Sequence, residues 1–153
     1  MPLRVRDFMS TPVIATTPDA TAVEAYRLML DRVIGGLPVL EGDELVGVVT
    51  VTDLRDVDEA TPVGEIMSTD VVTVTPDQSL FEAAELLADH NIARLPVLSQ
   101  DDQLVGIVSR ANIVKAIADE EQSTSIIAEA RAARKARRGW VRRRRVTRGE
   151  APR

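Results

Sequence analysis

The stretch Leu37-Pro38-Val39-Leu40 returns 58 residues later as Leu95-Pro96-Val97-Leu98. The repetition extends outward on both sides. A shift of 58 positions aligns residues 5–42 with a second copy, and one extra residue then brings residues 45–54 into register with theirs. The two copies share 21 identical positions. Self-similarity of this extent indicates that the body of the chain is one structural unit written twice.

Each copy carries the same order of secondary-structure signals. In the first, the β-branched run 13–16 predicts a strand that stops at a Thr-Pro-Asp turn. Thr21 and Glu24 have the spacing of a capping box, and the apolar residues that follow recur every three or four positions, as in a helix with one buried face. The Leu-Pro-Val-Leu segment and residues 45–50 predict two more strands, and a second helix begins near Thr52.

A unit of this size would be marginal alone, because so short a chain buries too little surface. We therefore expect an α/β (more narrowly α+β) fold in which two β-α-β-β-α repeats pack face to face with pseudo-two-fold symmetry. The expected boundaries are residues 1–58 for repeat 1 and 59–121 for repeat 2. Residues 122–153 are expected to form a basic tail, helical or disordered.

Composition excludes several classes of chemistry. The 153 residues contain no cysteine and one histidine, so thiolate nucleophiles, disulfides and cysteine-ligated metal centres are ruled out. No nucleophile–base pair is apparent, so we expect no enzyme activity and no metal site. No apolar run is long enough to span a membrane and the N-terminus lacks the features of a signal peptide, so we expect a cytoplasmic protein.

Four motifs recur in the same order in both copies. They are Met-Ser-Thr, Thr-Pro-Asp, Leu-Pro-Val-Leu and a Gly-apolar-apolar-Thr/Ser-x-x-Asp/Asn element. The ordered set resembles the cystathionine β-synthase-type (CBS) domain, and its duplication resembles the tandem pair called a Bateman module. The resemblance covers Val5 to about Ala118. It implies a regulatory module that binds a small molecule in the cleft between its repeats, most often an adenine nucleotide or related adenosine compound.

The resemblance also implies which residues hold that ligand. The last motif places Thr50 and Asp53 in one cleft-lining element and Ser109 and Asn112 in the other. The hydroxyls suit a phosphate, the Asp53 carboxylate can accept hydrogen bonds from ribose hydroxyls, and the apolar segments around Pro38 and Pro96 offer a slot for a flat base. The competing interpretation is that Thr50, Asp53, Ser109 and Asn112 are ordinary helix caps.

The two copies depart from the family pattern in different ways. Repeat 2 has Asn112 where the family usually has aspartate, a neutral group that binds ribose more weakly. It also has Arg94 directly before its Leu-Pro-Val segment, with Arg110 as a second candidate cation, whereas repeat 1 has Gly35-Gly36 there. One bound ligand per chain is therefore expected rather than two, with AMP, ADP, ATP and S-adenosylmethionine as candidates and no intrinsic cofactor.

The tail differs from the rest of the chain in its charge. Residues 1–130 carry 23 acidic and 8 basic side chains, whereas residues 131–153 carry 1 and 11. Helix-forming residues over 123–138 predict that a helix continues to Gly139, and a run of arginines follows, namely Arg142, Arg143, Arg144 and Arg145. This run could bind nucleic acid or an acidic partner, or it could be a frayed terminus.

Two functions are thus open. The favoured one is a stand-alone regulatory CBS-pair protein that senses an adenine nucleotide or adenosine derivative and signals to an unknown partner protein. The family usually dimerises, which implies a homodimer. The alternative is a scaffold whose arginine-rich tail does the binding.

Overall fold

The computed structural model describes residues 3–118, 128–130, 132–133 and 143–145. The chain divides into two compact units, and each unit is built around one repeat. The repeat-1 unit comprises Ile14–Val71 with Arg144–Arg153, and the repeat-2 unit comprises Met1–Val13 with Val72–Arg143. Each unit has its own cluster of buried apolar residues.

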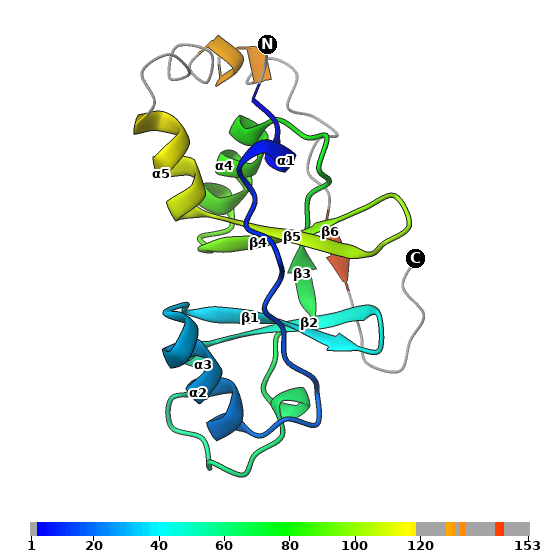
Figure 1. Ribbon diagram of the computed structural model, residues 1–153, viewed down its shortest axis with the longest axis vertical. Coiled ribbons are helices and arrows are strands. Elements are labelled where there is room, and N and C mark those ends of the chain that lie inside the picture. The colour runs from blue at the N-terminus through cyan, green and yellow to red at the C-terminus, as the bar shows by residue number, and fades with distance from the viewer. Residues whose placement is uncertain (1–2, 119–127, 131, 134–142, 146–153) are drawn as a thin grey trace. The chain divides into compact units, whose positions relative to one another are not determined.

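The repeat-1 unit is a two-stranded hairpin covered by helices (Figure 1). Strands β1 (Gly36–Glu41) and β2 (Glu44–Thr50) pair antiparallel, and helices α2 (Ala22–Arg32) and α3 (Val51–Leu54) pack against them. The predicted apolar stripe of α2 supplies the buried residues Ala22, Ala25 and Met29. The core is aliphatic, as the scarcity of aromatic residues in the chain requires.

The repeat-2 unit repeats this arrangement (Figure 1). Strands β4 (Arg94–Leu98) and β5 (Leu104–Ser109) form its hairpin, and helices α4 (Leu80–Asp89) and α5 (Arg110–Ala118) pack on it. A short helix, α1 (Val5–Phe8), contacts both α4 and α5. The predicted mixed α+β fold with two repeats is therefore confirmed.

The first strand that the sequence predicts is absent from repeat 1 and short in repeat 2. In repeat 1, residues 13–16 form no strand, and Thr16 makes a single parallel bridge to Val39. In repeat 2, the short strand β3 (Asp70–Val72) pairs with β6 (Arg143–Arg145), and the contact with β4 is one parallel bridge from Val74. The β-branched run marks an extended segment, but few of its residues find a ladder partner.

The segments that open the two repeats are exchanged. Val5 of the first copy is fully buried in the core of the repeat-2 unit, and the aligned Val63, in the short 3-10 helix η1 (Val63–Glu65), is fully buried in the core of the repeat-1 unit. The Met-Ser-Thr motifs follow the same rule, since Ser10 bridges Ile107 and Ser68 bridges Val48. Each hairpin is therefore edged by the opening segment of the other copy.

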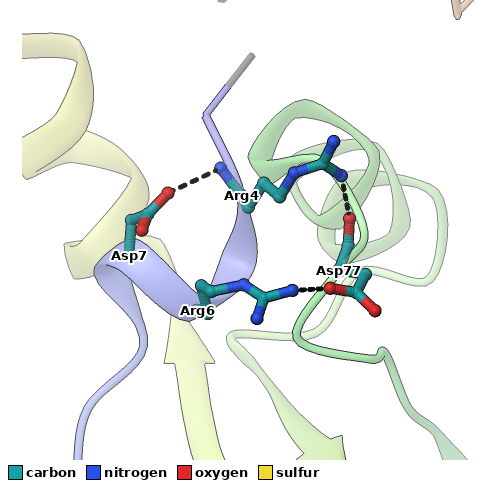
Figure 2. Close-up of polar contacts among 4 residues, drawn as sticks. All are labelled: Arg4, Arg6, Asp7 and Asp77. Carbon is teal, nitrogen blue, oxygen red and sulfur yellow. Dashed lines mark hydrogen bonds and ion pairs between the residues drawn. The ribbon is translucent and has the colours of Figure 1, made fainter. Parts of the chain in front are cut away.

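Polar contacts fix the exchanged N-terminal segment to the turn before α4 (Figure 2). The Arg4 guanidinium donates a hydrogen bond to the Asp77 carbonyl oxygen at 2.5 Å, and Arg6 forms an ion pair with the Asp77 carboxylate. The backbone N–H of Arg4 also donates to the Asp7 carboxylate at 3.2 Å. Because these groups are exposed, the ion pair contributes only about 0–1 kcal/mol to the stability of the fold. The burial of Val5 holds the segment in place more strongly than these polar contacts do.

The described part of the tail also contacts the N-terminal segment. Residues 128–130 and 132–133 are helical, in agreement with the predicted helix, and Ala133 is buried. The Glu129 carboxylate accepts a hydrogen bond from the backbone N–H of Leu3 at 3.1 Å. No helix in the part of the chain that the structure describes is long and apolar enough to cross a membrane.

Candidate ligand-binding site

In repeat 1, Thr50 and Asp53 form a capping box where β2 ends and α3 begins. The backbone N–H of Thr50 donates to Asp53 Oδ2 at 2.8 Å, and the backbone N–H of Asp53 donates to Thr50 Oγ1 at 3.3 Å. These bonds satisfy two backbone donors that the start of the helix would otherwise leave unpaired. The helix-cap interpretation of these two residues is therefore correct.

The capping bonds do not use all the hydrogen-bonding groups of Thr50 and Asp53. Asp53 is half-buried, and among the described residues its second carboxylate oxygen, Oδ1, has no hydrogen-bond donor. The Thr50 hydroxyl accepts from Asp53 but makes no donation within the described part of the chain. One anionic acceptor and one hydroxyl donor therefore lie together at the start of α3. Vicinal hydroxyls of a ribose would pair with such a set.

In repeat 2, Ser109 and Asn112 form the equivalent cap with an additional partner. Asn112 Oδ1 accepts from the backbone N–H of Ser109 at 2.7 Å and from its hydroxyl at 3.0 Å. The Asn112 amide nitrogen donates to the hydroxyl of Ser10 at 3.3 Å. Both polar side chains are thus engaged internally, which leaves less for a ligand than in repeat 1. Sequence analysis missed Ser10, although its position in the recurring Met-Ser-Thr motif was a signal.

Two arginines flank this cap. Arg94 is the first residue of β4, and its Cα pairs with that of Ser109 across the hairpin. Arg110 opens α5, and its backbone N–H donates to the carbonyl of Ala93 at 3.0 Å. Arg94 is half-buried and Arg110 is exposed. Burial lowers the pKa of Arg94 from its ordinary value, and the neighbouring positive charge of Arg110 lowers it further.

The predicted apolar slot is less accessible. Pro38 and Pro96 are buried within β1 and β4, and each carbonyl accepts a hydrogen bond from a neighbouring chain segment, from Thr16 and Val74 respectively. Because proline has no N–H to donate, a strand accommodates it only where no neighbouring strand needs that hydrogen bond. Their side chains contribute to the packing of each unit, and a role in contacting a base stays a prediction.

The other features considered for binding are the arginines of the tail, metal-ligating clusters and cavities. Arg142 lies outside the described residues, and Arg143, Arg144 and Arg145 form β6. No group of three or more acidic or histidine side chains in the described ranges is arranged to hold a metal ion.

A cavity of about 360 Å³ opens in the repeat-1 unit beside α2 and α3, with Tyr26, Val51, Leu54 and Glu59 in its lining. Sequence analysis did not predict this cavity.

Comparison with known proteins adds the family context. The family model "CBS domain" matches residues 5–60 and 63–119. The CBS domain-containing protein YhcV of Bacillus subtilis is 39% identical over 115 residues, which cover 71% of this chain and 81% of YhcV. The chain also matches longer relatives, of which it spans 21% to 40%.

Solved structures agree with this match. CBSX2, a CBS-pair protein from Arabidopsis thaliana, has been solved in complex with AMP; it is 30% identical, with a TM-score of 0.73, and the match covers 78% of this chain and 98% of CBSX2. The CBS domain pair of protein MJ0100 has been solved with 5′-methylthioadenosine and S-adenosyl-L-methionine. It is 25% identical, with a TM-score of 0.73, and the match covers 78% of this chain and 99% of that one.

Proposed function

Because this chain belongs to the CBS-domain family, we propose that it is a regulatory CBS pair that binds an adenine nucleotide or another adenosine derivative. Binding would change the conformation of the module, and a partner protein would respond to that change. The observation that carries the proposal is the Thr50–Asp53 pair, which retains an anionic acceptor after its capping bonds are made. The adenosine compounds held by CBSX2 and by MJ0100 support it.

Each repeat offers a ligand its own set of groups. Asp53 and Thr50 would bind the ribose hydroxyls, and hydrogen bonds to a charged carboxylate are worth about 1.5–3 kcal/mol each. Arg94 and Arg110 would supply positive charge, while Ser109 and Asn112 hold the start of α5 beside them. Within its own unit, Pro38 in β1 or Pro96 in β4 would back the base of a ligand bound there. The chain would bind one ligand.

Ser10 offers a route from ligand binding to a conformational response. It is tied to β5 by backbone hydrogen bonds with Ile107 and to α5 by the Asn112 amide. Displacement of the start of α5 by a ligand would therefore act directly on the exchanged N-terminal segment. This role is regulatory rather than catalytic, because the groups assembled here bind and position a ligand without forming a nucleophile–base pair.

The substitution Asp53→Asn tests the proposal with a control that the chain itself provides. Asn112 occupies the aligned position and makes the same capping bond, so Asp53→Asn should retain the helix cap and the melting temperature. It removes the charged acceptor, and we expect adenosine compounds to bind at least about tenfold more weakly by calorimetry. Unchanged affinity in a normally folded variant would contradict the assignment of Asp53.

We also propose that the protein acts as a homodimer, with the outer face of α2 in the interface. Tyr26, Leu30 and Val33 follow one another at helical spacing and are 43%, 58% and 90% exposed. Val33 has a φ of 55°, a left-handed conformation that is strained for a β-branched residue; the aligned Asn91, with a φ of 51°, tolerates it better. In such an interface the exposed apolar side chains of Tyr26, Leu30 and Val33 would be removed from water.

A further inference from the structure

The repeat-1 unit contains a cavity that the proposed function does not use. Helices α2 and α3 lie side by side (Figure 1), and the cavity of about 360 Å³ opens beside them. Three successive parts of the chain line it, namely α2, α3 and the residues that follow α3. All of its lining residues lie between positions 22 and 59, so this unit alone forms the cavity.

Backbone hydrogen bonds hold two of these parts together. The N–H of Val23 donates to the Glu59 carbonyl at 3.1 Å, and the N–H of Ala22 donates to the Thr61 carbonyl at 2.8 Å. Both bonds satisfy N–H groups at the start of α2 that have no partner within the helix. The residues after α3 are thereby fixed to the start of α2, so the fold itself sets the shape of the cavity.

Most of the cavity lining is apolar. Ala22 is buried, and Val23 and Leu54 are half-buried. Val51 and Tyr26 are 38% and 43% exposed, which leaves much of their apolar surface in contact with water. An apolar group placed in the cavity would cover this surface, and removing it from water is favourable. The occupant should therefore have an apolar part.

The lining also includes one cationic and one anionic side chain, those of Arg55 and Glu59. Both side chains are exposed, and within the described ranges neither takes part in a hydrogen bond or an ion pair. The two charges therefore do not neutralise each other. A guanidinium donates hydrogen bonds to a carboxylate, and a carboxylate accepts them from an ammonium group.

These two charges limit the class of ligand that fits. Glu59 would repel an anion such as a nucleotide phosphate, and Arg55 would repel a cation. A zwitterion would satisfy both side chains at once. The cavity volume lies near the lower end of the range of about 300–1,000 Å³ that is typical of ligand sites, which indicates a small molecule.

The second repeat does not carry this pair of charges. When the register of residues 45–54 is continued, Val114 aligns with Arg55. The same register aligns Ala118 with Glu59. The charge pair is therefore a property of repeat 1 and not of the architecture that the two repeats share.

We propose that the cavity binds an apolar α-amino acid in its zwitterionic form. The side chain of the ligand would lie against the apolar lining, its carboxylate would bind Arg55 and its ammonium group would bind Glu59. This ligand differs in class from an adenosine compound, and the inference does not depend on the proposed function. The cavity shares Tyr26 with the α2 face proposed for the homodimer, but neither Leu30 nor Val33 lines it.

Calorimetric titration of the full chain with L-leucine and L-phenylalanine tests this inference. We expect saturable binding of at least one of them, with one molecule per chain. The N-acetyl derivative of that amino acid lacks the ammonium group and its amide lacks the carboxylate, so each should bind at least about tenfold more weakly.

Substitutions then assign the two charges. Arg55→Gln and Glu59→Gln should each weaken binding of the amino acid at least about tenfold. The amide should bind equally to the wild type and to Arg55→Gln, because it lacks the group that Arg55 recognises. The control Arg32→Gln, on α2 but outside the lining, should leave all affinities unchanged. All three variants should keep the wild-type Tm, because the substituted side chains are exposed.

Several results would overturn the inference. One is the absence of a saturable heat with both amino acids. Another is binding that survives Arg55→Gln and Glu59→Gln, because the amino acid would then occupy a different site. Equal affinity for the amino acid and its two derivatives would also overturn it. None of these results bears on AMP binding, so failure of this inference is distinguishable from failure of the proposed function.

Discussion

Replacing Gly47 or Gly106 by alanine probes the exchange of opening segments, because each glycine faces the methionine of the other copy's Met-Ser-Thr motif. A Cβ atom built at Gly47 would lie 2.7 Å from Met67 Sδ and 2.8 Å from the Ser68 carbonyl oxygen. A Cβ at Gly106 would lie 2.5 Å from Met9 Sδ and 2.9 Å from Met9 Cγ. All of these separations are shorter than ordinary van der Waals contact, so something must move in each variant.

The atoms that must move differ between the two sites. At Gly106 the close atoms belong to the Met9 side chain, which is flexible and half-buried and can change its rotamer. At Gly47 one of them is the backbone carbonyl of Ser68, which accepts a hydrogen bond from the N–H of Val48 at 3.0 Å. Relief there requires a shift of the backbone and weakens that bridge.

We therefore expect Gly47→Ala to lower the free energy of unfolding by about 1–3 kcal/mol, the usual cost of overpacking. Gly106→Ala should cost less than about 1 kcal/mol, because the reduced freedom of the unfolded chain offsets part of the penalty. For a chain of this size each kcal/mol corresponds to about 2–4 °C in Tm. The assay is thermal and urea unfolding of the full chain, followed by circular dichroism.

Methionine truncation makes the test sharper. Adding Met9→Ala should remove the penalty specific to Gly106→Ala, whereas Met67→Ala should only partly rescue Gly47→Ala because the Ser68 carbonyl remains. A double-mutant cycle measures each coupling. The reasoning would be refuted if Gly106→Ala were the more destabilising variant or if Met67→Ala fully restored Gly47→Ala.

Two further predictions concern α2. Hydrogen bonds from Thr21, first from its backbone N–H and then from its hydroxyl, lower the pKa of Glu24 below its ordinary 4.5. The ionised Glu24 side chain should therefore stabilise the fold fully above pH 4.5, and this stabilisation should disappear as the pH falls through the lowered folded-state pKa. Glu24→Gln should lose this part of the pH dependence of Tm, and an unchanged profile would contradict the assignment. Leu30→Glu should reduce the mass measured by light scattering from that of a dimer to the 16.7 kDa of a single chain. Arg32→Ala, which changes the net charge by the same amount, should remain dimeric. A monomeric wild-type protein would disprove the homodimer.

Much of the fold follows from local sequence signals. The Thr21–Glu24 box and its second copy cap α2 and α4 as predicted, because capping depends on residues only three positions apart. The hairpins follow from apolar runs separated by polar turns. The strand predicted at residues 13–16 reduces to a single bridge, since strand formation depends on a partner that local propensity does not specify.

The exchange of opening segments could not be predicted from the repeat alone. Val5 and Val63 are identical and aligned, and nothing local states whether each packs in its own copy or in the other. For the candidate site, the family resemblance pointed to Thr50, Asp53, Ser109 and Asn112, with Arg94 and Arg110 as the candidate cations, and the role of these residues in binding stays a prediction. The internal bond from Asn112 to Ser10 depends on that exchange, and so sequence analysis missed it.

The most direct test of the central claim is isothermal titration calorimetry of the full chain with AMP, supported by thermal shift under the same conditions. We predict a saturable binding heat with one AMP per chain and a raised Tm, because a ligand that binds only the folded state stabilises it. The absence of both heat and thermal shift with AMP, ADP, ATP, methylthioadenosine and S-adenosylmethionine would contradict the account.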